Sequence, residues 1–203
     1  MNFEYGLHVF HSPQLQSVVD DAIQFFGRTP LHPLPPAARF VGTGVYELYY
    51  TGNYALYVSI SRANQDDCRQ PIYVGKAVPP GWRTAKSRET ETPVLYGRLQ
   101  EHARSIQQGE GLSVNDFSCR FMILTDVESD LIVPVEAELI RRYKPLWNSV
   151  VDGFGNHDPG SGRYNQAKSE WDVLHPGRSW AERLTGRALR LEDVIARIRV
   201  ALG

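Results

Sequence analysis

Residues 41–60 are rich in aromatic and β-branched side chains, whereas the segments on either side have helical periodicity, and this contrast most narrows the folds open to the chain. Strands are predicted at residues 45–50 and 56–60, with Thr51-Gly52-Asn53 as the turn between them, and again at 71–75 and 117–124. We expect an α+β (mixed α/β) fold with a small central antiparallel sheet of about three strands, flanked by helices.

Apolar residues recur at helical spacing in residues 15–26, 94–106 and 133–144. In the second of these segments Leu95, Leu99, Ala103 and Ile106 form one stripe, which is typical of an amphipathic helix. Four prolines within residues 29–36 predict an extended arm. The chain therefore reads as a helix, an arm, and then a core of strands and helices.

The length of 203 residues favours a single domain spanning 1–203. Within it we expect an N-terminal helix and proline-rich arm at 1–40, a core at 41–150 and a tail at 151–203. The tail begins with a turn-rich loop, residues 151–164, and continues in helical pieces at 166–174 and 191–202. Loops this rich in Gly, Asn and Asp are often functional.

Charge is unevenly distributed along the chain. Residues 1–140 carry 11 basic and 16 acidic side chains, whereas residues 141–203 carry 11 and 7. Such asymmetry favours a polyanionic partner. Residues 76–88 form a second basic segment with Lys76, Arg83, Lys86 and Arg88 and no acidic residue. Charge alone is equally compatible with solvated surface loops.

Several classes of protein are excluded by composition. No run of about 18 uncharged apolar residues exists, which argues against a membrane-spanning helix and a membrane partner. The first basic residue is Arg28, so the N-terminus is unlike a secretory signal. Cys68 and Cys119 are too few for a disulfide framework or a four-cysteine zinc site. We expect a cytoplasmic protein.

Two carboxylates on the helix predicted at 133–144 differ in their surroundings. Glu138 faces Arg141 and Arg142 and is explained by surface pairing. Glu136 points along the partly apolar face, where a carboxylate needs a cation, hydrogen bonds or a raised pKa. It is a candidate metal ligand or acid/base group, with a structural role as the alternative.

Arg98 and His102 are four residues apart and share one helix face, with Glu101 and Arg104 elsewhere. Such a pair can bind a phosphate and relay a proton, although plain surface residues are the alternative. In the strand at 45–50, alternation directs Tyr46 to the same face as Leu48 and Tyr50, where a tyrosine can equally be core.

In order along the chain these residues resemble the motifs of the GIY-YIG nucleases. The resemblance comprises Gly44-Val45-Tyr46, Tyr73-Val74-Gly75-Lys76, Arg98 with His102, and Glu136 with Asn148. The resemblance covers residues 41–150. Two segments, residues 73–77 (YVGKA) and 136–148 (EAELIRRYKPLWN), are especially similar to the catalytic domain of the UvrC-type repair nucleases. The two motif tyrosines are 27 residues apart, which implies an insertion and leaves Tyr49 and Tyr50 as alternatives to Tyr46.

The resemblance implies metal-dependent phosphodiester hydrolysis. Glu136 would hold a single Mg²⁺ or Mn²⁺ ion, and either Tyr46 with a lowered pKa or His102 would take the proton of the attacking water. Arg98 would clamp the scissile phosphate, and Lys76 would add positive charge there. Tyr73 would orient the phosphate or the water, and Asn148 would hold the site together.

The tail is similar to the accessory region of a small group of type II restriction endonucleases, which implies a bacterial homodimer that cuts double-stranded DNA at a GC-rich palindrome such as CCGCGG. The resemblance implies that the tail at 151–203 serves both DNA recognition and dimerisation. A companion DNA methyltransferase is expected with it. Arginine is the commonest reader of guanine, so the base-reading candidates are Arg163, Arg178, His157 and Asn156. The candidates for backbone phosphate are Arg83, Lys86 and Arg88.

Two other functions stay open from the sequence. One is a structure-selective repair or homing nuclease with the same chemistry. The other is a catalytically silent DNA-binding module on the same scaffold.

Overall fold

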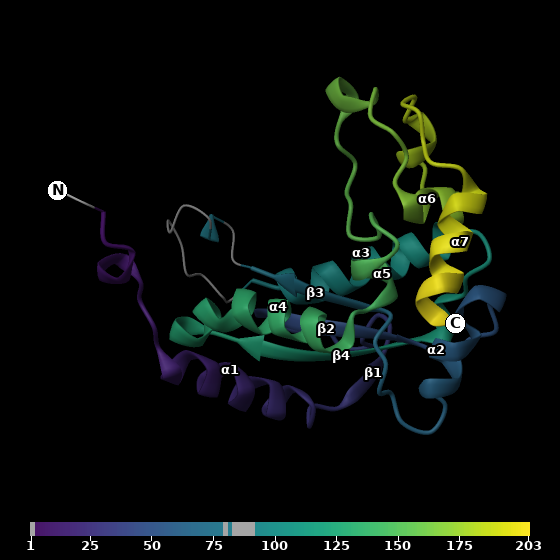
Figure 1. Ribbon diagram of the computed structural model, residues 1–203. Coiled ribbons are helices and arrows are strands. Elements are labelled where there is room, and N and C mark those ends of the chain that lie inside the picture. Colours follow the sequence, from purple (N-terminus) through teal and green to yellow (C-terminus); the bar gives the residue numbers. More distant parts are fainter. Residues whose placement is uncertain (1–2, 79–80, 83–91) are drawn as a thin grey trace.

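A computed structural model describes residues 3–78, 81–82 and 92–203 of the chain. At its centre is a four-stranded antiparallel sheet with strand order β1-β4-β2-β3 (Figure 1). The strands are β1 (Leu31–Pro33), β2 (Thr43–Tyr50), β3 (Tyr73–Ala77) and β4 (Phe117–Leu124). The α+β class predicted from the sequence is confirmed, with one strand more than expected.

Helices occupy the segments with helical periodicity. The longer ones are α1 (Pro13–Phe26), α3 (Val94–Gln108), α4 (Ile132–Tyr143) and α7 (Leu191–Leu202). The shorter ones are α2 (Val58–Ala63), α5 (Leu146–Ser149) and α6 (Glu170–Leu174). Short 3₁₀ helices are η1 (Tyr5–His8), η2 (Ala55–Tyr57), η4 (Val114–Asp116), η5 (Asp126–Leu131), η6 (Ser161–Arg163) and η7 (Ala181–Arg183). No helix among the described residues is long and apolar enough to cross a membrane.

One local prediction was wrong and a second was incomplete. The strand expected at residues 56–60 is helical, because Tyr57 is buried and its hydroxyl accepts a hydrogen bond from Trp147 of α5, at 3.1 Å. Packing against distant aromatic residues thus overrides strand propensity. The proline-rich arm contains β1, which pairs with β4 at the edge of the sheet, a position that tolerates proline.

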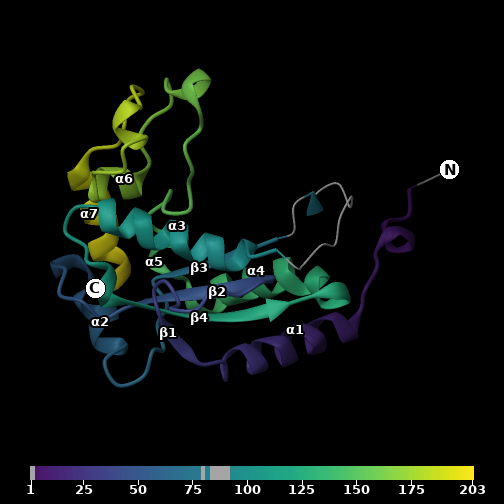
Figure 2. The same ribbon diagram turned by 180° about the vertical axis from the view of Figure 1, so that it is seen from behind.

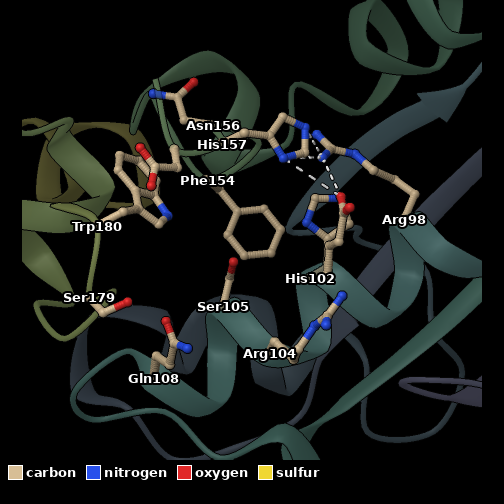
Figure 3. A pocket seen from close by; sticks show the side chains of 12 residues that line it. Arg98, His102, Arg104, Ser105, Gln108, Phe154, Asn156, His157, Ser179 and Trp180 are labelled. Carbon is tan, nitrogen blue, oxygen red and sulfur yellow. Dashed lines mark hydrogen bonds and ion pairs between the residues drawn. The ribbon is translucent and has the colours of Figure 1, made fainter. Parts of the chain in front are cut away.

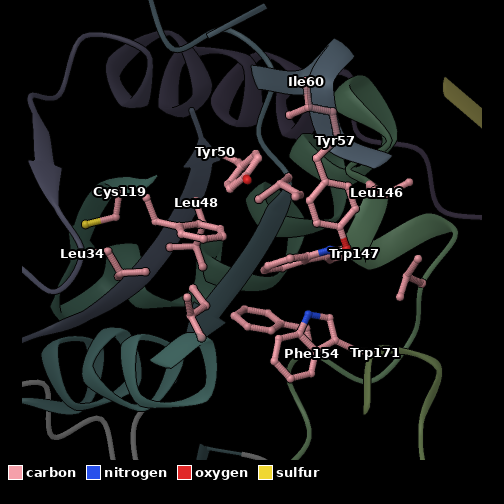
Figure 4. Close-up of a cluster of buried hydrophobic side chains, with 14 of the residues drawn as sticks. Leu34, Leu48, Tyr50, Tyr57, Ile60, Cys119, Leu146, Trp147, Phe154 and Trp171 are labelled. Carbon is pink, nitrogen blue, oxygen red and sulfur yellow. Dashed lines mark hydrogen bonds between the residues drawn. The ribbon is translucent and has the colours of Figure 1, made fainter. Parts of the chain in front are cut away.

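The two faces of the sheet are covered by different helices (Figures 1 and 2). Val45 of β2 packs against α1 and α4 on one face. Tyr46, Leu48 and Tyr50 pack on the other face against α3, α5 and the tail, in the cluster drawn in Figure 4. The alternation predicted along this strand is therefore confirmed, and β2 is buried over its whole length.

The tail extends away from the sheet. The segments that carry η6 and η7 rise together above α6 in Figures 1 and 2, and a backbone bridge joins Ala167 to Gly186. The base of the tail returns to the sheet, where Trp171 is fully buried in the cluster beside α3 and α5. This contact brings residues 153–158 next to α3.

Candidate active site

A cavity of about 630 Å³ lies at the β3 edge of the sheet, between α3 and α4. Five of the seven residues expected to be catalytic line it, and they come from two strands and two helices. They are Tyr46, Tyr73, Lys76, Arg98 and Glu136. Glu101 and His157 contribute further charged or titratable groups to its wall.

Gly75 explains how Tyr46 reaches this cavity. The two residues are paired across β2 and β3, and a Cβ atom on Gly75 would lie only 2.4 Å from the Tyr46 hydroxyl oxygen. The ring of Tyr46 therefore occupies the space that any larger residue at position 75 would take. Of the tyrosines left open by the sequence, Tyr49 instead bonds to Glu47, and the hydroxyl of Tyr50 accepts a bond from the Tyr54 amide.

His102 lies directly behind Tyr46 and is buried on α3. Its Nε2 atom is 2.6 Å from the Tyr46 hydroxyl oxygen. Burial, together with the Arg98 guanidinium, lowers the pKa of His102 well below its usual value. Burial raises the pKa of Tyr46 well above its usual value, and this outweighs the opposing charge of Arg98. The pair is thus neutral near pH 7, and the lowered pKa expected for Tyr46 is wrong for the chain by itself.

Glu136 projects from α4 into the cavity and forms an ion pair with Lys76 of β3. The Glu136 side chain is 14% exposed, so the carboxylate is accessible and still mostly covered by protein. Its helix neighbour Glu138 behaves as the sequence predicted and bonds to Arg141 and Arg142 on the surface. The inward direction predicted for Glu136 agrees with this arrangement.

The donor set of the cavity fits a hard divalent cation bound through Glu136. A carboxylate oxygen is the kind of ligand that Mg²⁺ prefers, and Mg²⁺ commonly uses one or two carboxylates and completes its shell with water and phosphate oxygens. Within the described ranges no three His, Cys, Asp or Glu side chains gather closely enough to form a metal cage. A cation here would therefore depend on Glu136 and on oxygens from water and substrate.

Arg98 links the cavity to the tail. Its Nη1 donates to Glu101 at 2.9 Å and contacts His157 (Figure 3). Its Nη2 donates to the carbonyl of Gly155 at 2.7 Å. Glu101, expected on a different face, reaches Arg98 because residues three apart on a helix are neighbours. The tail residues Phe154 and Gly155 were missed as site residues, although the turn-rich composition of residues 151–164 pointed to that loop.

Asn148 holds the edge strand in place from outside the cavity. Its Oδ1 accepts from the Val74 amide and its Nδ2 donates to the Val74 carbonyl, both at 2.8 Å. This clamp uses the side-chain amide on both sides, and it agrees with the structural role expected for Asn148.

The residues expected to contact DNA are divided by the structure. Asn156, His157 and Arg163 are exposed on the tail, and His157 also borders the catalytic cavity. Arg178 is 1% exposed and fully engaged with protein groups, so its predicted role as a base reader is wrong. The predicted phosphate contacts Arg83, Lys86 and Arg88 lie outside the described residues.

A second, smaller cavity of about 250 Å³ separates α3 from the tail (Figure 3). It is lined by Arg104 and Gln108 of α3 on one side and by Asn156 and Trp180 of the tail on the other. The larger cavity and the exposed tail are therefore adjacent, with Arg98 and His157 lining both cavities.

One comparison with known proteins gives a match that spans the site. The family model of the Eco29kI GIY-YIG domain matches residues 38–202, which include every element of the cavity and the whole tail except the last residue. No protein of curated function matches the chain significantly. Because this family model matches most of the chain, the chain belongs to the Eco29kI GIY-YIG domain family, a restriction endonuclease family of the GIY-YIG superfamily.

Proposed function

We propose that this chain is a type II restriction endonuclease that hydrolyses phosphodiester bonds of double-stranded DNA at a short GC-rich palindrome, with CCGCGG as the candidate site. The observation that carries the proposal is the convergence of Tyr46, Arg98 and Glu136 on one cavity, with His102 bonded to Tyr46 behind it. These residues supply a proton acceptor, a phosphate-binding cation and a metal-binding carboxylate.

In this proposal Tyr46 and His102 act together as the general base. The attacking water gives a proton to the Tyr46 oxygen while Tyr46 passes its own proton to Nε2 of His102, 2.6 Å away. The neutral imidazole that burial and Arg98 favour is the form able to accept that proton. The water oxygen then forms the new bond to phosphorus as the bond to the 3′ or 5′ oxygen of the DNA breaks.

The remaining residues bind and orient the phosphate. Arg98 and Lys76 place positive charge beside the nonbridging oxygens, and the Tyr73 hydroxyl orients the phosphate or the water. Asn148 keeps β3, and with it Tyr73 and Lys76, in position. Glu136 would hold Mg²⁺, or Mn²⁺ in its place, and the bound cation supplies charge neutralisation at the phosphate and activation of water.

In this proposal the enzyme is a single domain with its core at 41–150. The tail is the element that recognises the DNA sequence. Asn156, His157 and Arg163 are exposed there, and an arginine bidentate to guanine suits a GC-rich site. Arg83, Lys86 and Arg88 are proposed to contact backbone phosphates. Recognition of a palindrome calls for a homodimer, because protein two-fold symmetry then matches that of the DNA. A companion methyltransferase and a cytoplasmic location belong to the same proposal.

The test is cleavage of a sequenced plasmid that contains CCGCGG, with Mg²⁺ and with a chelator. We expect discrete fragments that end at one sequence and require the cation. Glu136→Gln should lower the rate at least about 100-fold. The matched control Glu138→Gln changes a carboxylate on the same helix that bonds only to surface arginines in the described structure, and should cut like the wild type.

Other outcomes would overturn the proposal in distinct ways. Tight DNA binding without cleavage under any divalent cation would indicate a silent binding module. Preference for flaps or damaged DNA over intact plasmid would indicate a structure-selective repair nuclease, and cutting at a long asymmetric site would indicate a homing nuclease.

A further inference from the structure

Arg178 is the most completely bonded charged residue among those described. It is 1% exposed, and its Nε and Nη2 form a bidentate ion pair with Asp172, itself 1% exposed, at 2.7 and 2.8 Å. The other guanidinium hydrogens reach the carbonyls of Gly153, Phe154 and Asn156 at 2.9, 3.0 and 3.3 Å. All five donors of the guanidinium therefore have acceptors.

The rest of the guanidinium is enclosed by aromatic rings. Its central carbon lies 4.6 Å from the ring centres of both Trp171 and Trp180, on which it stacks. Ser169 donates to Asp172 at 2.6 Å and fixes the carboxylate. The ion pair is thus held rigidly at the base of the tail, and three of its bonds end on the backbone of residues 153–156.

Residues 153–157 in turn contact the proposed catalytic residues. The Phe154 ring stacks on His102, with ring centres 4.6 Å apart and planes inclined by 18°. The Gly155 carbonyl accepts from Arg98. A Cβ atom on Gly155 would lie 2.6 Å from the Tyr73 hydroxyl oxygen, so the loop backbone also borders Tyr73. One loop therefore contacts three of the proposed catalytic residues, namely His102, Arg98 and Tyr73.

From this chain of contacts we propose that Arg178 and Asp172 are positioning residues for DNA cleavage, which fix the loop 153–157 and through it the orientations of His102 and Arg98. The inference rests on the proposed nuclease function. It also joins the recognition tail to the catalytic cavity, because Asn156 is exposed for DNA and its carbonyl is bonded to Arg178.

Two variants separate positioning from folding. Arg178→Lys keeps the positive charge but loses the planar fork that reaches three carbonyls and one carboxylate. The double variant Arg178→Met with Asp172→Leu removes both charges together, so that neither is left buried without its partner. The matched control is Lys168→Gln, which removes an exposed ion pair with Glu182 on the same tail.

The first readout is single-turnover cleavage, with DNA affinity and thermal unfolding measured beside it. Both variants should cut at least tenfold more slowly, with DNA affinity within threefold of the wild type and a folded chain at the assay temperature. Lys168→Gln should match the wild type in all three. Wild-type cleavage rates in folded Arg178→Lys would overturn the proposal and leave the nuclease function intact.

The second readout does not depend on cleavage. The groups facing His102 are Tyr46, Tyr73, Arg98, His157 and Phe154. Burial, to which the Phe154 ring contributes, holds the pKa of His102 low, and the double variant removes one positive and one negative charge together. Release of the loop should therefore raise the pKa of His102, measured by NMR titration. An unchanged titration would overturn the proposal even if the wild type cuts no DNA.

A variant that leaves the ion pair intact covers the case in which both substitutions unfold the chain. Phe154→Leu removes the ring that stacks on His102 and should also raise its pKa and slow cleavage at least tenfold. Wild-type values for both in Phe154→Leu would contradict the proposed route through the loop.

Discussion

Glu47 is a carboxylate buried in β2 on the sheet face opposite Tyr46, and one of its oxygens has no hydrogen-bond partner among the described residues. Burial raises the pKa of Glu47 to about 7, although the Tyr49 hydroxyl bond and the Arg120 charge oppose the shift. The folded chain therefore keeps a proton that the unfolded chain releases between about pH 4.3 and 7. Stability present at low pH is lost as the pH rises through 7.

Glu47→Gln should accordingly raise the free energy of unfolding at pH 8, by about 3 kcal/mol, and leave it little changed at pH 4. Urea unfolding at both pH values measures the difference. Glu138→Gln, on the surface of α4, is the control and should show no such gain. An equal gain for Glu47→Gln at both pH values would refute the proton linkage.

Arg163 is an exposed residue of η6, and its proposed contact with DNA is a property of this single side chain. If its guanidinium reads a guanine, Arg163→Ala should relax discrimination at one base pair by about 1–3 kcal/mol. Cleavage of a panel of sites with single substitutions measures this, with Arg199→Ala on α7 as the exposed-arginine control. Uniformly weaker cleavage of every site would instead assign Arg163 to a phosphate.

At the scale of elements, the pairing of β2 with β3 sets the geometry of the site. Val45 faces α4 while Tyr46 crosses Gly75, and Lys76 on the same edge strand meets Glu136 of α4. At this edge of the sheet the strand pair thus places Tyr46 on one face and Lys76 on the other. Asn148 secures this edge by bonding both backbone groups of Val74.

Gly75→Ala should therefore impair the site with little effect on the rest of the sheet. The added carbon would lie 2.4 Å from the Tyr46 hydroxyl and displace the ring from His102. We expect cleavage to fall at least tenfold while the chain stays folded. Gly27→Ala, where a Cβ meets nothing nearer than 3.6 Å, is the matched control. Full activity of Gly75→Ala, measured by plasmid cleavage, would show that the Tyr46 position is not critical.

At the scale of the molecule, the N-terminal segment before α1 exposes several large apolar side chains. The backbone before α1 extends away from the sheet (Figure 1). Its large apolar side chains are at least 73% exposed, at Phe3, Tyr5, Leu7 and Phe10. Large exposed apolar patches typically mark protein interaction sites. We therefore propose that this segment contributes to the homodimer, in addition to the tail at 151–203 for which the sequence predicts a role in dimerisation.

Light scattering should give twice the mass of the single chain at micromolar concentration. The double substitution Phe3→Ser with Phe10→Ser should shift the population toward the monomer. Val200→Ser is a control on α7, because Val200 is equally exposed and belongs to a different part of the chain. A monomeric wild type, or a dimer unaffected by the double substitution, would contradict this assignment.

The sequence by itself determined the helices at α1, α3, α4 and α7, most of the strands, and the order of the motif residues. Periodicity and motif spacing are local properties, and burial of one face follows from them. It also distinguished Glu136 from Glu138, because only the latter has arginine neighbours three and four residues away.

The tertiary structure alone decided the helical form of residues 55–63, the burial of Arg178 and the contact of Phe154 and Gly155 with the catalytic residues. Each depends on which distant segment packs opposite. Tyr57 is helical because Trp147 and His175 accommodate its ring and hydroxyl, and Arg178 is inside because Asp172 and three loop carbonyls satisfy it. A charged side chain is buried only where the fold supplies hydrogen-bonding or oppositely charged groups to pair with it. Local periodicity carries no information on those groups, because they come from distant segments.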